Sequence, residues 1–268
     1  MKFLNKAIDE ASAAKEVIIK ERFAQKEIVM DVQDVVTIAF IEDMAKKAET
    51  LKCLIENKSD YIDSISRSIF ELSVYLKLLL SEHNKIYGRS YNAFVKYRGY
   101  KMYQSVIAEN KTGRKIREWL DIDRDKFLNE SPINELSEEL EQLKKRYADV
   151  FELRNENQEW YNLDGKTRNF QQLCIKLGMQ ADYEIYYRLM SSEVHALDVM
   201  NRWKFDPNEI SILENFKDTN MHINMATTLL LNTIDAAYTF YGLKARLKTF
   251  RTLLSVNYGL EKRRQLYK

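Results

Sequence analysis

Six polar side chains share one face of a helix that the sequence predicts between residues 179 and 203. At about 100° per residue, these side chains fall within a strip about 80° wide. We call this strip the polar seam; it consists of Glu184, Arg188, Ser191, His195, Asp198 and Arg202. The rest of the helix surface is mostly aromatic or aliphatic, which predicts a largely buried helix. The polar seam must then pair with other buried groups, line a cleft or face a partner.

Arg188 and His195 are the two residues of the polar seam that could act together on a phosphodiester. Their spacing places them on one face, about 10.5 Å apart along the helix axis. A histidine can move the proton of a ribose 2′-hydroxyl or of a leaving oxygen, and an arginine can hold the scissile phosphate. These two groups are sufficient for metal-independent RNA cleavage. Glu184 could steady Arg188, and Asp198 could orient the imidazole.

The same residues also fit a purely structural interpretation. Glu184 and Arg188 have the spacing of an ion pair along a helix surface, and His195 could be a hydrogen-bonded histidine of the core. The spacing of one arginine and one histidine is weak evidence by itself. The catalytic interpretation therefore depends on the whole polar seam and on the apolar helix that carries it.

The sequence offers no pattern for other common catalytic centres. It lacks a glycine-rich phosphate loop, and its three histidines and two cysteines (Cys53 and Cys174) do not have zinc-binding spacing. A di-iron site on a helical bundle would need Glu-x-x-His, which does not occur. We therefore expect no metal and no cofactor. Two scattered cysteines, no apolar signal sequence and no membrane span predict a cytoplasmic protein.

The elements that position the polar seam are expected to be helices. The chain has only 7 glycines and 2 prolines in 268 residues, too few for the frequent turns of a strand-rich fold. Its 45% hydrophobic and 31% charged residues are typical of a folded globular protein. The net charge of +2 argues neither for nor against nucleic acid as a partner. The predicted fold class is all-α.

The segment 60–83 has the clearest helical pattern. Its apolar residues recur three and four positions apart, which predicts one continuous stripe. The stripe consists of Ile62, Ile65, Ile69, Leu72, Leu76 and Leu79. Arg67 and Glu71 lie one turn apart beside it. They could complete the site of the polar seam, or form a buried ion pair that fixes the packing.

Residues 86–110 mix tyrosines with lysines and arginines at helical spacing. Such a pattern could stack on the bases of a nucleic acid strand and neutralise its phosphates. Alternatively, the rings are buried in the core while the cations cover the outside. We favour the second interpretation.

Turn and cap signals divide the chain into its expected parts. Ser131-Pro132 and Asp206-Pro207 each predict the start of a helix. Gly165 predicts a turn, Gly178 the end of a helix and Gly242 a break between helices. The expected parts are a helical segment at 1–57 that begins as a long arm, a helical bundle core at 58–258 with a charged helical insertion at 111–165, and a basic tail at 259–268.

The spacing of Arg188 and His195 resembles the signature of the HEPN superfamily, helical proteins named for higher eukaryotes and prokaryotes nucleotide-binding. In that signature an arginine precedes a histidine by about two helical turns. The segments 67–72 and 187–195 also resemble a bacterial family known only by a domain-of-unknown-function label. The resemblance implies a HEPN-like helical bundle with Arg188 and His195 in the signature roles. Leu189 departs from the commonest signature, which has a polar residue directly after the arginine.

The resemblance further implies a homodimer that brings two polar seams together. It implies metal-independent endoribonuclease activity on RNA, as in a toxin or an anti-phage defence effector. The alternative is a non-catalytic helical module that binds RNA, a nucleotide or a protein partner as a sensor or regulatory subunit. The residues expected to support the catalytic pair are Glu184, Ser191, Asp198, Arg67 and Glu71.

Overall fold

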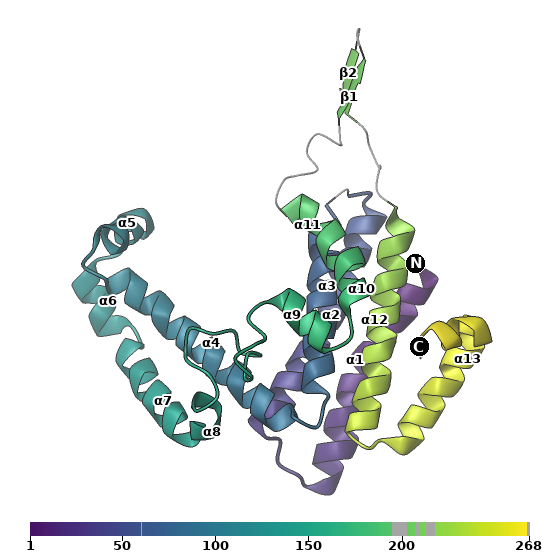
Figure 1. Cartoon of the computed structure of the whole chain (residues 1–268), viewed down its shortest axis with the longest axis horizontal. Helices are drawn as coiled ribbons and strands as arrows, with labels where there is room; N and C mark the ends of the chain where they lie inside the picture. Colours follow the sequence, from purple (N-terminus) through teal and green to yellow (C-terminus); the bar gives the residue numbers. More distant parts are fainter. Residues whose placement is uncertain (60, 195–202, 207–208, 213–217, 267–268) are drawn as a thin grey trace. The chain divides into compact units, whose positions relative to one another are not determined.

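The computed structural model describes residues 1–59, 61–194, 203–206, 209–212 and 218–266. Apart from one short hairpin these residues form helices and their connections, which confirms the all-α prediction. The chain divides into two compact units, whose elements are labelled in Figure 1. Unit 1 comprises Met1–Asn84 and Leu173–Lys268, and unit 2 comprises Lys85–Gln172. Within the described ranges, no helix has both the length and the apolar character needed to cross a membrane.

Four long helices form the core of unit 1. They are α1 (Lys2–Val17), α2 (Val32–Glu56), α3 (Asp63–Leu79) and α12 (Thr219–Phe240). Helix α2 packs against α1 and α3, and α12 packs against all three (Figure 1). A π-helical segment, η1 (Ile18–Phe23), and a 3-10 turn, η2 (Ala24–Lys26), follow α1. Helix α13 (Lys244–Leu266) follows α12 and packs against it.

Helix α1 belongs to this core, which corrects the expectation of a long N-terminal arm. Its buried residues recur three and four positions apart and form one face of the helix. They are Leu4, Ala7, Ile8, Ala11 and Ala14. Because most of these side chains are small, α1 can approach α2 and α12 closely.

The predicted apolar stripe of α3 lies in the core, as expected. Ile65 is partly buried, and the other five residues of the stripe are buried. The helix begins at Asp63 and ends at Leu79, a few residues inside the expected segment 60–83. Arg67 and Glu71 lie on the other side of α3, toward the segment 183–194 that is described below.

Glycines end helices where the sequence predicted them to do so. Gly178 follows α9 (Phe170–Lys176), and Gly242 separates α12 from α13. Both have a φ of +69°, in the left-handed region that favours glycine. Helix α7 (Ile133–Arg146) begins directly after Pro132, but the side chain of Ser131 does not cap it.

A β-hairpin replaces the helix expected to start at Asp206-Pro207. Strand β1 (Trp203–Asp206) pairs antiparallel with β2 (Glu209–Ile212), and Trp203 lies opposite Ile212. An aspartate followed by proline is also a common turn sequence. Aromatic and β-branched residues at alternate positions in 203–206 and 209–212 favour strands over a helix.

Unit 2 contains α4 (Asn84–Ile107), α5 (Lys111–Leu120), α6 (Arg124–Glu130), α7 and α8 (Ala148–Phe151). The tyrosines of α4 surround a buried tryptophan: Tyr87 and Tyr91 meet Trp160 edge to face, with ring centroids 6.4 and 5.3 Å apart. Two cations of α4 form ion pairs within the unit, Arg89 with Asp149 and Lys96 with Glu139. These contacts favour the core interpretation of residues 86–110 over a nucleic acid surface.

Candidate functional site

The described part of the polar seam lies on a π-helical segment and the helix after it. The chain continues from α9 through α10 (Gln180–Asp182), the π-helical η3 (Tyr183–Arg188) and α11 (Leu189–Val194). Both η3 and α11 pack against α3. Glu184, Arg188 and Ser191 are described, whereas His195, Asp198 and Arg202 lie outside the described residues. Short π-helical segments within α-helices are frequently found at functional sites.

The expectation of a largely buried helix is wrong for residues 183–191, the part whose side chains the structure describes. Met190 is fully buried, but Ile185 and Leu189 are 51% and 58% exposed. Tyr186 faces α3, where its ring centroid lies 5.9 Å from that of Phe70. The segment therefore packs on α3 with one side only, and both polar and aliphatic side chains remain exposed on the other.

Arg188 and Glu184 form an exposed ion pair on η3. Arg188 Nη1 donates to Glu184 Oε2 over 2.8 Å, and the Arg188 side chain is 66% exposed. An exposed pair of this kind stabilises a helix by only about 0.3–0.5 kcal/mol. Glu184 thus holds Arg188 in place, but breaking this ion pair would cost little free energy. The guanidinium is accessible to a ligand.

Arg67 of α3 is the second cation at this surface. Its Nε donates to Glu71 Oε1 over 3.0 Å, and its Nη2 donates to the Tyr187 hydroxyl of η3. The guanidinium carbon lies 4.0 Å from the centroid of the Tyr187 ring. Arg67 Nη1 is buried and has no hydrogen-bond partner among the residues that the structure describes. Within one chain, α3 therefore brings Arg67 and Glu71 to the segment that carries Arg188.

Tyr183 lies within electrostatic reach of both guanidinium groups. Its ring stacks on Tyr187, with centroids 5.0 Å apart and 18° between the planes. Burial raises the pKa of Tyr183, and the positive charges of Arg188 and Arg67 oppose that rise. Tyr183 and Tyr187 thus form one stacked pair that Arg67 contacts, and Arg188 directly follows Tyr187 on η3.

Ser191 has a local role in the helix. Its hydroxyl donates to the backbone carbonyl of Tyr187, one turn earlier. A serine bonded in this way competes with the regular backbone ladder and adjusts the helix locally. Ser191 therefore shapes the segment, and its hydroxyl is already engaged there.

The sequence interpretation missed the two tyrosines that organise this surface. Tyr183 and Tyr187 were counted with the apolar side of the helix, where an aromatic ring gives no distinctive signal. Their position four residues apart was a usable clue, because such a spacing allows two rings to meet on one helix face. The partner of Tyr187 on α3 lies 120 residues away in the chain, so no local pattern could identify it.

A second polar cluster, also missed, lies inside the bundle between α3 and α12. His222 Nδ1 is 2.8 Å from Ser66 Oγ, and His222 Nε2 is 3.3 Å from Asp63 Oδ1. The three residue types are those of a hydrolytic triad. However, His222 is only 2% exposed and Ser66 is fully buried, so a substrate cannot reach the hydroxyl. The cluster satisfies polar groups in the core and ties α12 to α3.

The surface formed by α3 and η3 is suited to an anion. Arginine binds phosphate through a planar set of donors, and the guanidinium of Arg188 is exposed for such a contact, whereas that of Arg67 is engaged with Glu71 and Tyr187. Within the described ranges, no group of three or more His, Cys, Asp or Glu side chains is arranged to hold a metal ion.

A family model matches residues 34–210, well over half of the chain. That model is described as "Family of unknown function (DUF5677)". The matched range includes α3, η3 and α11, and therefore the whole surface described above. No curated protein and no solved structure matches the chain.

Proposed function

The chain belongs to the DUF5677 family, and we propose that it is a metal-independent endoribonuclease of HEPN type with Arg188 and His195 as its catalytic residues. The observation that most supports this proposal is the exposed guanidinium of Arg188 on the segment that Arg67 holds through Tyr187. An exposed guanidinium such as that of Arg188 can bind a phosphodiester and neutralise its charge. His195, at the signature spacing from Arg188, would be the group that transfers the proton.

In the proposed reaction, a ribose 2′-oxygen attacks the adjacent phosphorus while the bond from phosphorus to the 5′-oxygen of the next nucleotide breaks. His195 accepts the proton of the 2′-hydroxyl, and a proton is returned from its imidazole to the leaving 5′-oxygen. Arg188 holds the phosphate and stabilises the charge that develops on its oxygens, with Arg67 as a second cation. The products are a 2′,3′-cyclic phosphate and a 5′-hydroxyl, and no co-reactant is consumed.

The proposal includes a homodimer. Ile185 and Leu189 are exposed one turn apart near Arg188, and a second copy that covered them would bury apolar surface next to the catalytic residues. Such a dimer would bring two polar seams together, as the HEPN resemblance implies. Light scattering of the wild type and of Leu189→Lys tests this point. We expect a dimer for the wild type and a monomer for the variant.

Analysis of the RNA ends tests the proposed chemistry. Labelled single-stranded RNA is incubated with the purified protein in excess EDTA, and the products are examined for a 2′,3′-cyclic phosphate. We expect that product from the wild type and a rate lower by about 10²–10⁴-fold from His195→Ala, the usual contribution of a positioned acid–base group. Expression in cells should slow growth for the wild type only. Absence of cleavage, with or without metal, would overturn the proposal.

Two observations favour the non-catalytic alternative. Arg188 already has Glu184 as a partner, and Leu189 follows it in place of the polar residue of the commonest signature. In that case the surface would bind RNA or a nucleotide without cutting it, as a sensor or regulatory subunit. A ligand-dependent rise in melting temperature that Arg188→Ala removes, without any cleavage, would support this function over the enzyme.

A further inference from the structure

The outer face of α5 in unit 2 presents an exposed tryptophan in line with cations. Lys111, Lys115 and Trp119 follow one another at intervals of four residues, so they form one stripe along the helix. All three are exposed, and Trp119 is 87% exposed. An indole so far out of the core is unusual, since tryptophan is normally buried or placed at an interface.

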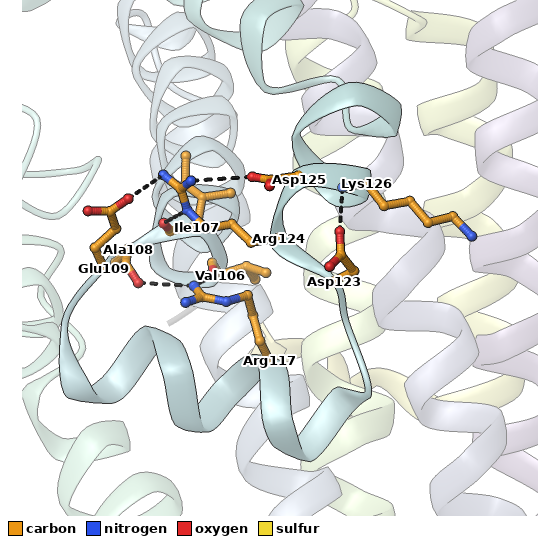
Figure 2. A network of polar contacts seen from close by, with 9 residues as sticks. All are labelled: Val106, Ile107, Ala108, Glu109, Arg117, Asp123, Arg124, Asp125 and Lys126. Carbon is orange, nitrogen blue, oxygen red and sulfur yellow. Dashed lines mark hydrogen bonds and ion pairs between the residues drawn. The ribbon is translucent and has the colours of Figure 1, made fainter.

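The inner face of α5 is anchored to the end of α4 by one arginine, and a second arginine, on α6, binds the same end. Figure 2 shows that Arg117 donates to the carbonyls of Val106 and Ala108, and that Arg124 of α6 donates to the carbonyl of Ile107. These bonds satisfy carbonyls that a helix end leaves without partners. The anchoring fixes which side of α5 faces solvent.

Gly113 allows the close approach that this anchoring needs. A Cβ atom at Gly113 would lie 2.1 Å from the backbone oxygen of Ala108. The backbone N–H of Gly113 also donates a hydrogen bond to the side chain of the cap residue, Asn110 Oδ1, over 2.9 Å. With its inner side held this firmly, α5 is a rigid support for the side chains on its outer side.

The cations of the outer face are not committed to carboxylates. Lys111, Arg114 and Lys115 are exposed, and no carboxylate that the structure describes lies within ion-pair distance of them. Glu118 is the single acidic residue of the helix; it lines a pocket with Arg114, Asp121 and Asp123, whereas Lys111 and Lys115 lie outside that pocket. Other cations of unit 2 are paired: Arg89 with Asp149, Lys96 with Glu139 and Lys144 with Glu156. The outer face of α5 therefore has positive charge available to a polyanion.

We propose that the outer face of α5 binds single-stranded RNA. Lys111, Lys115 and Arg114 would contact phosphates, and an unpaired base would stack on Trp119. In a duplex the bases stack on one another, so a side chain on this helix could not reach a base face. The inference rests on the proposed function for the choice of RNA, and it assigns unit 2 the task of holding the strand.

Binding of a non-cleavable strand tests this inference separately from catalysis. The probe is a fluorescein-labelled oligonucleotide with 2′-O-methyl riboses, which lacks the nucleophile of the proposed reaction. Fluorescence anisotropy is measured for the wild type, Trp119→Ala, Lys111→Glu/Lys115→Glu and the control Lys145→Glu, an exposed lysine of α7 in the same unit. We expect Trp119→Ala to weaken binding about tenfold or more and the control to bind like the wild type.

Two further readouts distinguish stacking from charge. The double lysine variant should lower the slope of log affinity against log salt by about 0.7 for each lost phosphate contact. Trp119 emission should be quenched on binding, which is seen by subtracting the signal of Trp119→Phe from that of the wild type. A single-stranded DNA of the same sequence shows whether the 2′-position contributes.

The outcomes separate this inference from the proposed function. Binding through α5 without cleavage of ordinary RNA supports the inference and contradicts the nuclease. Cleavage with unchanged binding in Trp119→Ala and in the double lysine variant supports the nuclease and overturns the inference. The inference is also overturned if the wild type binds no strand, or if Trp119→Ala changes only the mass measured by light scattering, which would make this face a contact between copies.

Discussion

The guanidinium carbon of Arg67 on α3 lies 4.0 Å from the ring centroid of Tyr187 on η3, and Arg67 Nη2 also donates to the Tyr187 hydroxyl. One side chain thereby makes a cation–π contact and a hydrogen bond to the same partner. The pair fastens the π-helical segment to the core helix. It also keeps Arg67 close to the surface from which Arg188 is exposed.

A double-mutant cycle measures this pairing. Arg67→Ala should lower the free energy of unfolding by about 1–3 kcal/mol, because it also removes the partner of the half-buried Glu71. Tyr187→Phe keeps the ring and loses the hydroxyl, so it should cost less. The coupling energy between Arg67→Ala and Tyr187→Ala should be about 1 kcal/mol in chemical denaturation. Strictly additive effects would mean that the two side chains do not stabilise each other.

The buried His222 should be a stability determinant. His222→Ala removes the contacts with Ser66 and Asp63 and leaves a cavity between α3 and α12, so we expect a loss of about 2–4 kcal/mol. His83→Ala is the matched control, since His83 is exposed and should change stability by less than about 0.5 kcal/mol. Equal melting temperatures for the two variants would contradict the role assigned to His222.

Cys174 should make stability depend on pH in the alkaline range. Burial, followed by the charges of Asp182 and Glu71, raises the pKa of the Cys174 thiol from 9.0 to about 12. Because the pKa is higher in the folded state, the stability that the neutral thiol contributes is complete below 9.0 and decreases as the pH rises toward about 12. Denaturation at several alkaline pH values should therefore show a smaller decline for Cys174→Ala than for the wild type.

Cys53 has an exposed thiol, so its reactivity can be compared with that of the buried Cys174 in the same protein. A thiol reagent at neutral pH should modify Cys53 rapidly in the folded protein and Cys174 only after unfolding, because the thiolate is the reactive form. Equal rates at the two cysteines in the native state would show that Cys174 is not buried.

Two glycine substitutions should have opposite signs. Gly113→Ala forces a Cβ toward the Ala108 carbonyl and should destabilise the protein by about 1–3 kcal/mol. Gly99→Ala, within α4, meets no atom within 4 Å and should stabilise the helix by about 0.5–1 kcal/mol. Thermal denaturation of both variants checks the pair. A neutral Gly113→Ala would contradict the close approach of α5 to α4.

The elements predicted well were those with a strong local pattern. The three-to-four spacing of apolar residues in α3 indicated a helix with that side buried in the core. The glycines after α9 and α12 marked helix ends. The hairpin at 203–212 was missed because Asp206-Pro207 fits a turn as well as a helix start. A local sequence signal with two physical meanings is decided by the residues around it.

The contacts around the candidate site could be predicted only in part, because some of them depend on tertiary packing. Periodicity identified Glu184 and Arg188 on one side of a helix, and their ion pair is present. Periodicity could not reveal that α3 covers only one side of η3. The burial of that segment was therefore overestimated. Arg67 was proposed as a supporting residue, but its bond to Tyr187 depends on tertiary packing between distant parts of the chain.

The most direct test of the proposed function is the rate of RNA cleavage in EDTA by Arg188→Ala beside Arg98→Ala, an exposed arginine of unit 2. Removal of Arg188 should change the free energy of unfolding by less than about 0.5 kcal/mol, since its ion pair is exposed. We predict that Arg188→Ala cleaves RNA about 10²–10³-fold more slowly than the wild type, while Arg98→Ala is unaffected. Equal cleavage rates for the wild type and Arg188→Ala would contradict the account.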